Sequence, residues 1–102
     1  MRRLVIAEPA EADLEAIADY IALNDPGAVE NVYLRIVEAA KRLPEFPALG
    51  RLGRVADTRE FSVSDLPYLI VYTVDTEVVT VLAIFHTKRN LAAIMRDRID
   101  DR

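Results

Sequence analysis

The chain has 102 residues, the usual length of one compact domain, and 52% of them are hydrophobic and 29% charged, which is typical of a folded protein. It contains no cysteine and a single histidine, which excludes disulfides, thiol nucleophiles and metal sites built from several Cys or His side chains. We therefore expect one domain over residues 1–102 that needs no metal or cofactor.

The net charge is −4, from thirteen Lys and Arg against seventeen Asp and Glu. This sign disfavours a protein that coats nucleic acid nonspecifically. In the second half of the chain, bases are in local excess in residues 51–59 and 86–98. No apolar run approaches the ~20 residues of a membrane helix, and the one near the N-terminus is too short for a signal peptide. We expect a cytoplasmic protein.

The first half of the chain predicts one strand and two helices. Residues 3–6 are β-branched and are followed by Pro9, which predicts a strand that ends before a helix. Apolar residues then recur at the spacing of one helix face over residues 9–24 and again over 29–43. Turn residues separate the two segments, so we expect a helical hairpin.

The second half predicts strands. Residues 44–57 contain two Pro and two Gly without a sustained period, which predicts a long loop, often a functional feature. Residues 58–63, 68–74 and 78–85 predict three strands. The order implies an α+β fold, with the helical hairpin packed on a small, mainly antiparallel sheet. Apolar spacing within residues 87–102 adds a short C-terminal helix.

Several segments, in this order, resemble the RelE/ParE superfamily of bacterial toxins. After the opening strand they are PAEADLEAIADYI, NDPGAVENV, LPEFPALGRLGR, TREFSVSDLPYLIVYTVD and VLAIFHTKRN. Their order and spacing over residues 3–92 carry the resemblance. It implies the toxin of a toxin–antitoxin pair, neutralised by a small cognate antitoxin. Members of the superfamily are either ribosome-dependent mRNA endonucleases, the RelE-like branch, or inhibitors of DNA gyrase, the ParE-like branch.

Metal-free cleavage of RNA by its own 2′-hydroxyl requires a base, an acid and cations around the phosphate. His86 titrates near neutral pH and Tyr68 can donate a proton. Candidates for holding phosphate are Arg51, Arg54, Arg59 and Arg89. If the chain is a nuclease, we expect its catalytic residues to be His86, Arg89, Arg59 and Tyr68.

Comparison with the nuclease pattern favours the ParE-like branch. When PYLIVY is set on the pattern YRLVY of RelE-like nucleases, Leu69 replaces their phosphate-binding Arg. Their two upstream basic positions fall on Glu60 and Ser62, and their C-terminal Tyr has no equivalent after Arg89, the one basic match. Removal of one oxyanion-hole donor costs on the order of 3 kcal/mol of transition-state stabilisation, and we expect each missing cation to cost a similar amount.

The ParE-like reading requires a surface that docks on a protein. The predicted loop gives Arg51 and Arg54 little structural work, so we expect this pair to bind the target. The other target-binding candidates are Arg59, His86, Lys88 and Arg89. A structural role is the commoner one for a lone His at a strand end. Tyr68 and Tyr72 share one face of their strand, where packing around a satisfied hydroxyl is the commoner role.

Three functions stay open on the sequence: a gyrase inhibitor, a RelE-like ribosome-dependent nuclease, and an inactive toxin that survives as an antitoxin-binding module. In each case we expect a cognate antitoxin as partner. The edge strands of an open sheet present unpaired backbone groups, so a disordered antitoxin segment can add a strand or lay a helix across the two helices.

Overall fold

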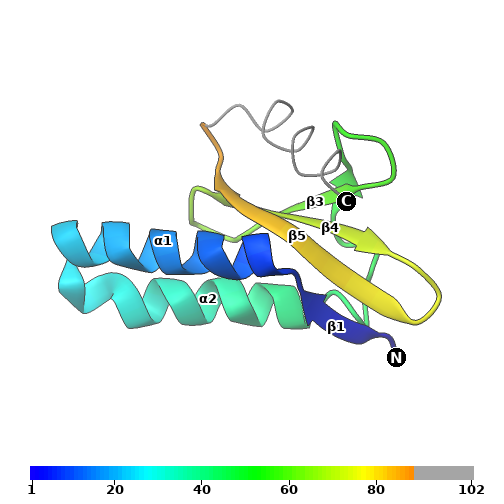
Figure 1. Cartoon of the computed structure of the whole chain (residues 1–102), viewed down its shortest axis with the longest axis horizontal. Coiled ribbons are helices and arrows are strands. Elements are labelled where there is room, and N and C mark those ends of the chain that lie inside the picture. The colour runs from blue at the N-terminus through cyan, green and yellow to red at the C-terminus, as the bar shows by residue number, and fades with distance from the viewer. Residues whose placement is uncertain (89–102) are drawn as a thin grey trace.

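The computed structural model describes residues 1–88, and eight elements follow one another within them (Figure 1). They are β1 (Arg3–Ile6), α1 (Glu8–Asn24), the 3₁₀ turn η1 (Pro26–Ala28), α2 (Val29–Lys41), β2 (Arg51–Leu52), β3 (Arg59–Ser62), β4 (Tyr68–Val74) and β5 (Val78–His86). The expected C-terminal helix and Arg89 lie outside the described residues.

One mixed sheet contains all five strands, in the order β1-β5-β4-β3-β2. The pairs β5–β4, β4–β3 and β3–β2 are antiparallel, whereas β1 pairs with β5 in parallel. Figure 1 shows α1 and α2 side by side as an antiparallel hairpin next to the sheet. The predicted α+β fold with a mainly antiparallel sheet is confirmed.

The prediction of an uninterrupted loop over residues 44–57 is wrong at β2. This two-residue strand pairs with β3, so that Arg51 lies opposite Glu60 and Leu52 opposite Arg59. Two residues are too few to show a strand period, and only the hydrogen bonds to β3 create the strand. The sheet therefore has one strand more than the sequence predicted, and the basic residues of the segment are held at its edge.

The first helix begins at Glu8, one residue before the predicted start. Pro9 lies in its first turn, where the missing N–H of proline is not needed. Glu8 and Glu11 also lie there and complement the positive end of the helix dipole. Neither described helix is long and apolar enough to cross a membrane.

Two apolar clusters lie on the two faces of the sheet. The larger one joins helices and sheet and comprises Ala10, Leu14, Ile36, Ala40, Leu43, Val63, Tyr68, Ile70, Tyr72, Val79, Val81 and Ile84. The smaller one lies on the opposite face and comprises Leu69, Val71, Ala83 and Phe85. Successive residues of β4 alternate between the clusters, as the period of a strand requires. Tyr68 and Tyr72 thus share the helix-covered face, as predicted.

A β-bulge in β5 adjusts this alternation. Val71 pairs with Ala83 and Tyr72 pairs with Val81, which leaves Leu82 as an extra residue on β5. Leu82 and Ala83 consequently both pack on the face away from the helices. Before the bulge, Val79 and Val81 pack on the helix-covered face. The bulge allows this strand to fill both clusters.

Candidate functional site

A buried carboxylate organises the basic edge of the sheet. The Glu60 side chain is 1% exposed, and its Oε1 accepts a hydrogen bond from Nη2 of Arg51 over 3.0 Å. The same oxygen lies 3.7 Å from Nε of Arg54, while Oε2 accepts the backbone N–H of Arg54 over 2.9 Å. A buried carboxylate is tolerated only when it is paired and hydrogen-bonded, and these three contacts meet that condition.

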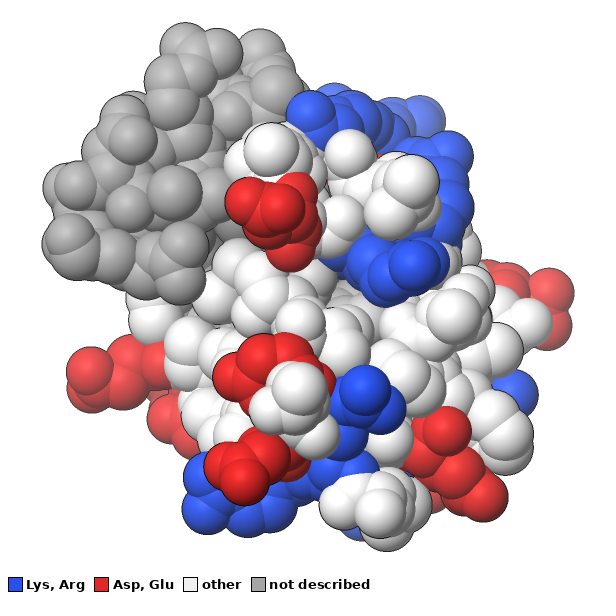
Figure 2. Space-filling model, turned by 90° about the vertical axis from the view of Figure 1, so that its right-hand side faces the viewer, with Lys and Arg blue, Asp and Glu red and all other residues white. Residues whose placement is uncertain are grey.

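The expectation that Arg51 and Arg54 do little structural work is therefore wrong, because both neutralise Glu60. Their side chains nevertheless remain 64% and 51% exposed. Leu52 lies between them in the sequence and is 76% exposed. Figure 2 shows Lys and Arg side chains gathered in the upper right part of the face that it presents. Charge and apolar area thus occur together at this edge.

The segment before β2 is held by a second network. The Tyr72 hydroxyl accepts the N–H of Gly50 and donates to the carbonyl of Pro47, each over 2.8 Å. Nη1 of Arg59 donates to the Gly50 carbonyl over 2.7 Å. Burial raises the pKa of Tyr72, opposed in part by the Gly50 N–H and by the charge of Arg59. The predicted packing of Tyr72 around a satisfied hydroxyl is confirmed.

His86 and Tyr68 form a second group of candidate residues, where β5 and β4 lie opposite each other. Their rings meet edge to face, with centroids 5.8 Å apart and planes at 86°. Nδ1 of His86 accepts the backbone N–H of Lys88 over 3.2 Å. Burial, and to a lesser extent the negative charge of an ionised Tyr20, raise the pKa of Tyr68.

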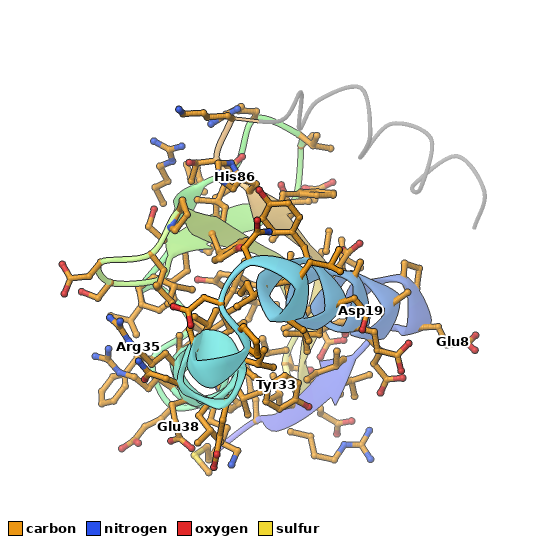
Figure 3. All side chains as sticks on the ribbon, turned by 90° about the vertical axis from the view of Figure 1, so that its left-hand side faces the viewer. Glu8, Asp19, Tyr33, Arg35, Glu38 and His86 are labelled. Carbon is orange, nitrogen blue, oxygen red and sulfur yellow. The ribbon has the colours of Figure 1, made fainter. Side chains whose placement is uncertain are left out.

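These two rings line an open pocket of about 370 Å³ between α1 and the sheet. The other residues that line it are Asp13, Ala16, Ile17, Tyr20 and Ile84. Figure 3 shows His86 above the helical hairpin, on the far side of it from Glu38. Because His86 lies opposite Tyr68 and shares this pocket with residues of α1, it belongs to the helix-covered side of the sheet.

Among the described nuclease candidates, the structure brings His86 and Tyr68 together but places Arg59 elsewhere. Arg59 lies opposite Tyr72 in the sheet, whereas His86 lies opposite Tyr68, four residues away along β4. At ~3.3 Å per residue, this offset between backbone positions is about 13 Å, and the Arg59 guanidinium is held at the Gly50 carbonyl rather than beside His86. Glu60 lies opposite Val71, whose side chain packs on the face away from the helices. The Glu60 cluster and the His86 pocket therefore occupy different faces.

Within residues 1–88, no three His, Asp or Glu side chains converge so as to hold a metal ion. Sequence reasoning also missed two acidic anchors, Glu60 and Asp13. In the sequence, Glu60 is noted chiefly because it occupies a basic position of the nuclease pattern. The signal that could have revealed its role is an isolated acid within a strand, with arginines six and nine residues before it in a segment that folds back.

Comparison with known proteins relates the chain to bacterial toxins. Residues 4–91 match the family described as ParE toxin of type II toxin–antitoxin system, parDE. The chain is 44% identical over 71 residues to putative toxin Y4kP of Sinorhizobium fredii, covering 68% of this chain and 74% of that protein. It is 40% identical over 89 residues to toxin RelE2 of Caulobacter vibrioides, covering 87% and 99%.

Solved structures agree with these relatives. A chain of the chromosomal ParDE system from P. aeruginosa superposes with a TM-score of 0.79 at 26% identity, over 84% of this chain and 96% of that one. The YoeB dimer from Staphylococcus aureus shares the fold, with a TM-score of 0.51 at 18% identity over 80% and 92%.

Fold and relatives together define a type II toxin of the RelE/ParE superfamily. Within that class, the chain belongs to the ParE toxin family, whose profile spans nearly the whole chain. The resemblance inferred from the sequence is confirmed, and membership implies a cognate antitoxin as partner.

Proposed function

We propose that this toxin inhibits DNA gyrase and that its cognate antitoxin prevents the inhibition. The match to the ParE family and the similarity to a ParDE chain support this branch. The observation that carries the proposal is the sheet edge at β2, where the half-exposed Arg51 and Arg54 lie beside Glu60 on one face and the exposed Leu52 lies on the other. Arginine and apolar side chains held rigidly together are typical of surfaces that dock on proteins.

Separation of the candidate residues also favours docking over catalysis. A protein-binding toxin needs no convergence of acid, base and phosphate-binding groups, and Arg59 lies four positions along β4 from His86 with its guanidinium held at the Gly50 carbonyl. In this proposal Arg51 and Arg54 make the main contact with gyrase. His86 and Lys88 are further candidates at the end of β5, and Arg89 is one outside the described residues.

A supercoiling assay with purified gyrase tests the proposal. Toxin freed from its antitoxin should inhibit supercoiling at micromolar concentration. Leu52→Glu should weaken inhibition by about tenfold or more, because a charge then has to be buried at the interface. Leu23→Glu is the matched control: Leu23 is 86% exposed at the end of α1, far along the chain from β2, and should leave inhibition unchanged.

Unchanged supercoiling with the wild-type toxin would contradict gyrase inhibition. Equal inhibition by the Leu52→Glu and Leu23→Glu variants would instead place the gyrase contact on another surface. Growth arrest on induction without the antitoxin is the check on activity itself, because an inactive antitoxin-binding module would not stop growth.

A second candidate function is ribosome-dependent mRNA cleavage. The relative named toxin RelE2 and the His86–Tyr68 pair beside an open pocket favour it. Because Nδ1 of His86 accepts a backbone N–H, the neutral imidazole carries its proton on Nε2, from which it can be donated. Tyr68 would then have the remaining proton-transfer role, and Arg89, the basic residue that matches the nuclease pattern, would bind phosphate. Arg59, the other expected phosphate-binding residue, is held at the Gly50 carbonyl instead.

A translation reaction separates the two functions. Reporter mRNA is translated with the toxin present, and primer extension is used to map new 5′ ends. Intact mRNA removes the nuclease function, whereas cleavage that disappears in His86→Ala would establish it. In cells, early loss of DNA synthesis indicates gyrase, and immediate loss of protein synthesis indicates the ribosome.

A further inference from the structure

We infer that Glu60 is a positioning residue: it holds Arg51 and Arg54 in a fixed two-armed arrangement that binds carboxylate groups on an acidic protein surface. The inference deepens the proposed docking function and rests on it. It assigns a role to Glu60, an acidic residue at a position where the nuclease pattern has a basic one.

The contacts leave most donors of the two arginines available. A guanidinium group has five N–H donors in a planar fork. Glu60 contacts Arg51 through Nη2 and approaches Arg54 through Nε, and both contacts converge on the same oxygen, Oε1. The remaining donors belong to side chains that are more than half exposed. Each arginine is thus anchored on its inner side and free to bind on its outer side.

The charge of Glu60 is what allows two cations to lie this close together. Both guanidinium groups lie within 4 Å of Oε1, where they would repel each other without the carboxylate between them. Oε2 in addition holds the backbone of Arg54 through its N–H. Glutamine at this position would keep one acceptor oxygen but would replace the other with an NH₂ donor, and it would lose the attraction that sets the spacing of the arginines.

The backbone around the arginines is fixed as well. Gly53 donates its N–H to the carbonyl of Thr58 over 2.8 Å, and a Cβ on Gly53 would lie 2.2 Å from Oγ1 of Thr58. At the other end, a Cβ on Gly50 would lie 2.6 Å from the Tyr72 hydroxyl. The segment therefore packs closely at the residue directly before each arginine. A preorganised surface of this kind loses little conformational entropy on binding.

The surroundings favour a protein partner over nucleic acid. Glu60 offsets one of the two arginine charges, and the chain as a whole carries a net charge of −4. Such a field is weak for a polyphosphate, whose binding depends on many unopposed cations. Leu52 follows Arg51 on the same edge strand, with its side chain on the other face of the sheet, and its 76% exposure adds apolar area of the kind that protein interfaces bury. Each arginine can bind a protein carboxylate through two parallel hydrogen bonds.

Chemical modification tests the positioning without any target. Phenylglyoxal reacts with accessible arginine side chains, and mass spectrometry follows the rate at each one. In Glu60→Gln, modification of Arg51 and Arg54 should accelerate severalfold, because their inner donors are released. Glu38→Gln is the matched control, since Glu38 is an exposed acid paired with Lys41 on α2. Equal rates in the wild type and Glu60→Gln would overturn the positioning role.

Gyrase inhibition tests the docking role of the positioned pair. Glu60→Gln should raise the inhibitory concentration about tenfold, the effect of losing one hydrogen bond to a charged group. Replacing both Arg51 and Arg54 by Lys keeps their charge and removes the planar fork, and it should weaken inhibition similarly. In the combined variant the effects should not add, because Glu60 acts through the arginines. Additive effects would overturn the inference.

Additional measurements distinguish a failure of this inference from a failure of the proposed gyrase inhibition. If the wild-type toxin leaves gyrase unaffected, growth arrest on induction replaces inhibition as the readout, and phenylglyoxal still reports the positioning. If Glu60→Gln does not copurify with the antitoxin in folded form, Glu60→Asp, which keeps the charge but shortens the reach, takes its place. Tight binding of a labelled oligonucleotide that depends on Arg51 and Arg54 would overturn the assignment to a protein partner.

Discussion

The carboxylate of Asp13 on α1 accepts a hydrogen bond from the backbone N–H of Ile84 on β5, over 2.9 Å and across 71 residues of sequence. β1 pairs with β5 only up to Val81, and no other strand of the described chain follows it along this edge. A helix side chain thus takes over where the strand ladder ends. The bond fixes the position of α1 along the sheet, and with it one wall of the His86 pocket.

We predict that Asp13→Ala lowers the free energy of unfolding by about 1.5–3 kcal/mol, the range for a hydrogen bond to a charged group. The loss arises because the Ile84 N–H is left beside an apolar methyl group. Chemical denaturation of the purified variant measures it. Asp19→Ala is the matched control, as Asp19 is an exposed acid on the same helix. A loss no larger than that of the control would show that this bond does not hold α1 in place.

Tyr72→Phe should cost about 1–3 kcal/mol of stability, because it leaves the Gly50 N–H and the Pro47 carbonyl without their buried partner. The aromatic ring and its packing are retained, so the change isolates the hydroxyl. Hydrogen exchange at the Gly50 amide should accelerate in the same variant. Tyr33→Phe, at a tyrosine that is 44% exposed, provides the comparison. Unchanged exchange at Gly50 would contradict the bridging role.

Acid should weaken the β4–β5 turn. Hydrogen bonds from the N–H groups of Glu77 and Val78 lower the pKa of Asp75 below 3.8, and the charges of Arg2 and Arg3 add to this. Because the pKa is lower in the folded state, the stabilising contribution is complete above the pKa of the unfolded chain. It is lost as the pH falls through the folded value.

Asp75→Asn removes this titration and keeps an oxygen acceptor in the turn. The stability difference between the wild type and Asp75→Asn should therefore be constant near neutral pH and should shrink as the pH falls below ~4. Denaturation curves recorded from pH 7 down to pH 2 provide the measurement. Parallel stability profiles for the two proteins would contradict the prediction.

Local patterns predicted most elements, because helix and strand periods depend on neighbouring residues. The strand over residues 68–74 was placed at its observed bounds, and both helices were placed within two residues of theirs. The exception is β2, a two-residue strand that exists only through its bonds to β3. The parallel pairing of β1 with β5 also joins segments at opposite ends of the described chain, and no local pattern reports such a pairing.

The surface formed by Arg51 and Arg54 was likewise predicted in part from local sequence, while the rest depends on tertiary contacts. Loop composition alone selected Arg51 and Arg54 as target-binding candidates, and this choice remains a prediction. Their attachment to Glu60 depends on the register of β2 on β3 and on the fold of the intervening turn, which the sequence pattern does not contain.

By itself, the sequence determined the class of fold, the superfamily and the absence of cysteine chemistry, because periodicity, segment order and residue types are local properties. The tertiary structure decided which candidate residues share a face. It placed His86 and Tyr68 beside α1 and Glu60 with its arginines on the other side, because cross-strand register and the alternation of side chains set that choice.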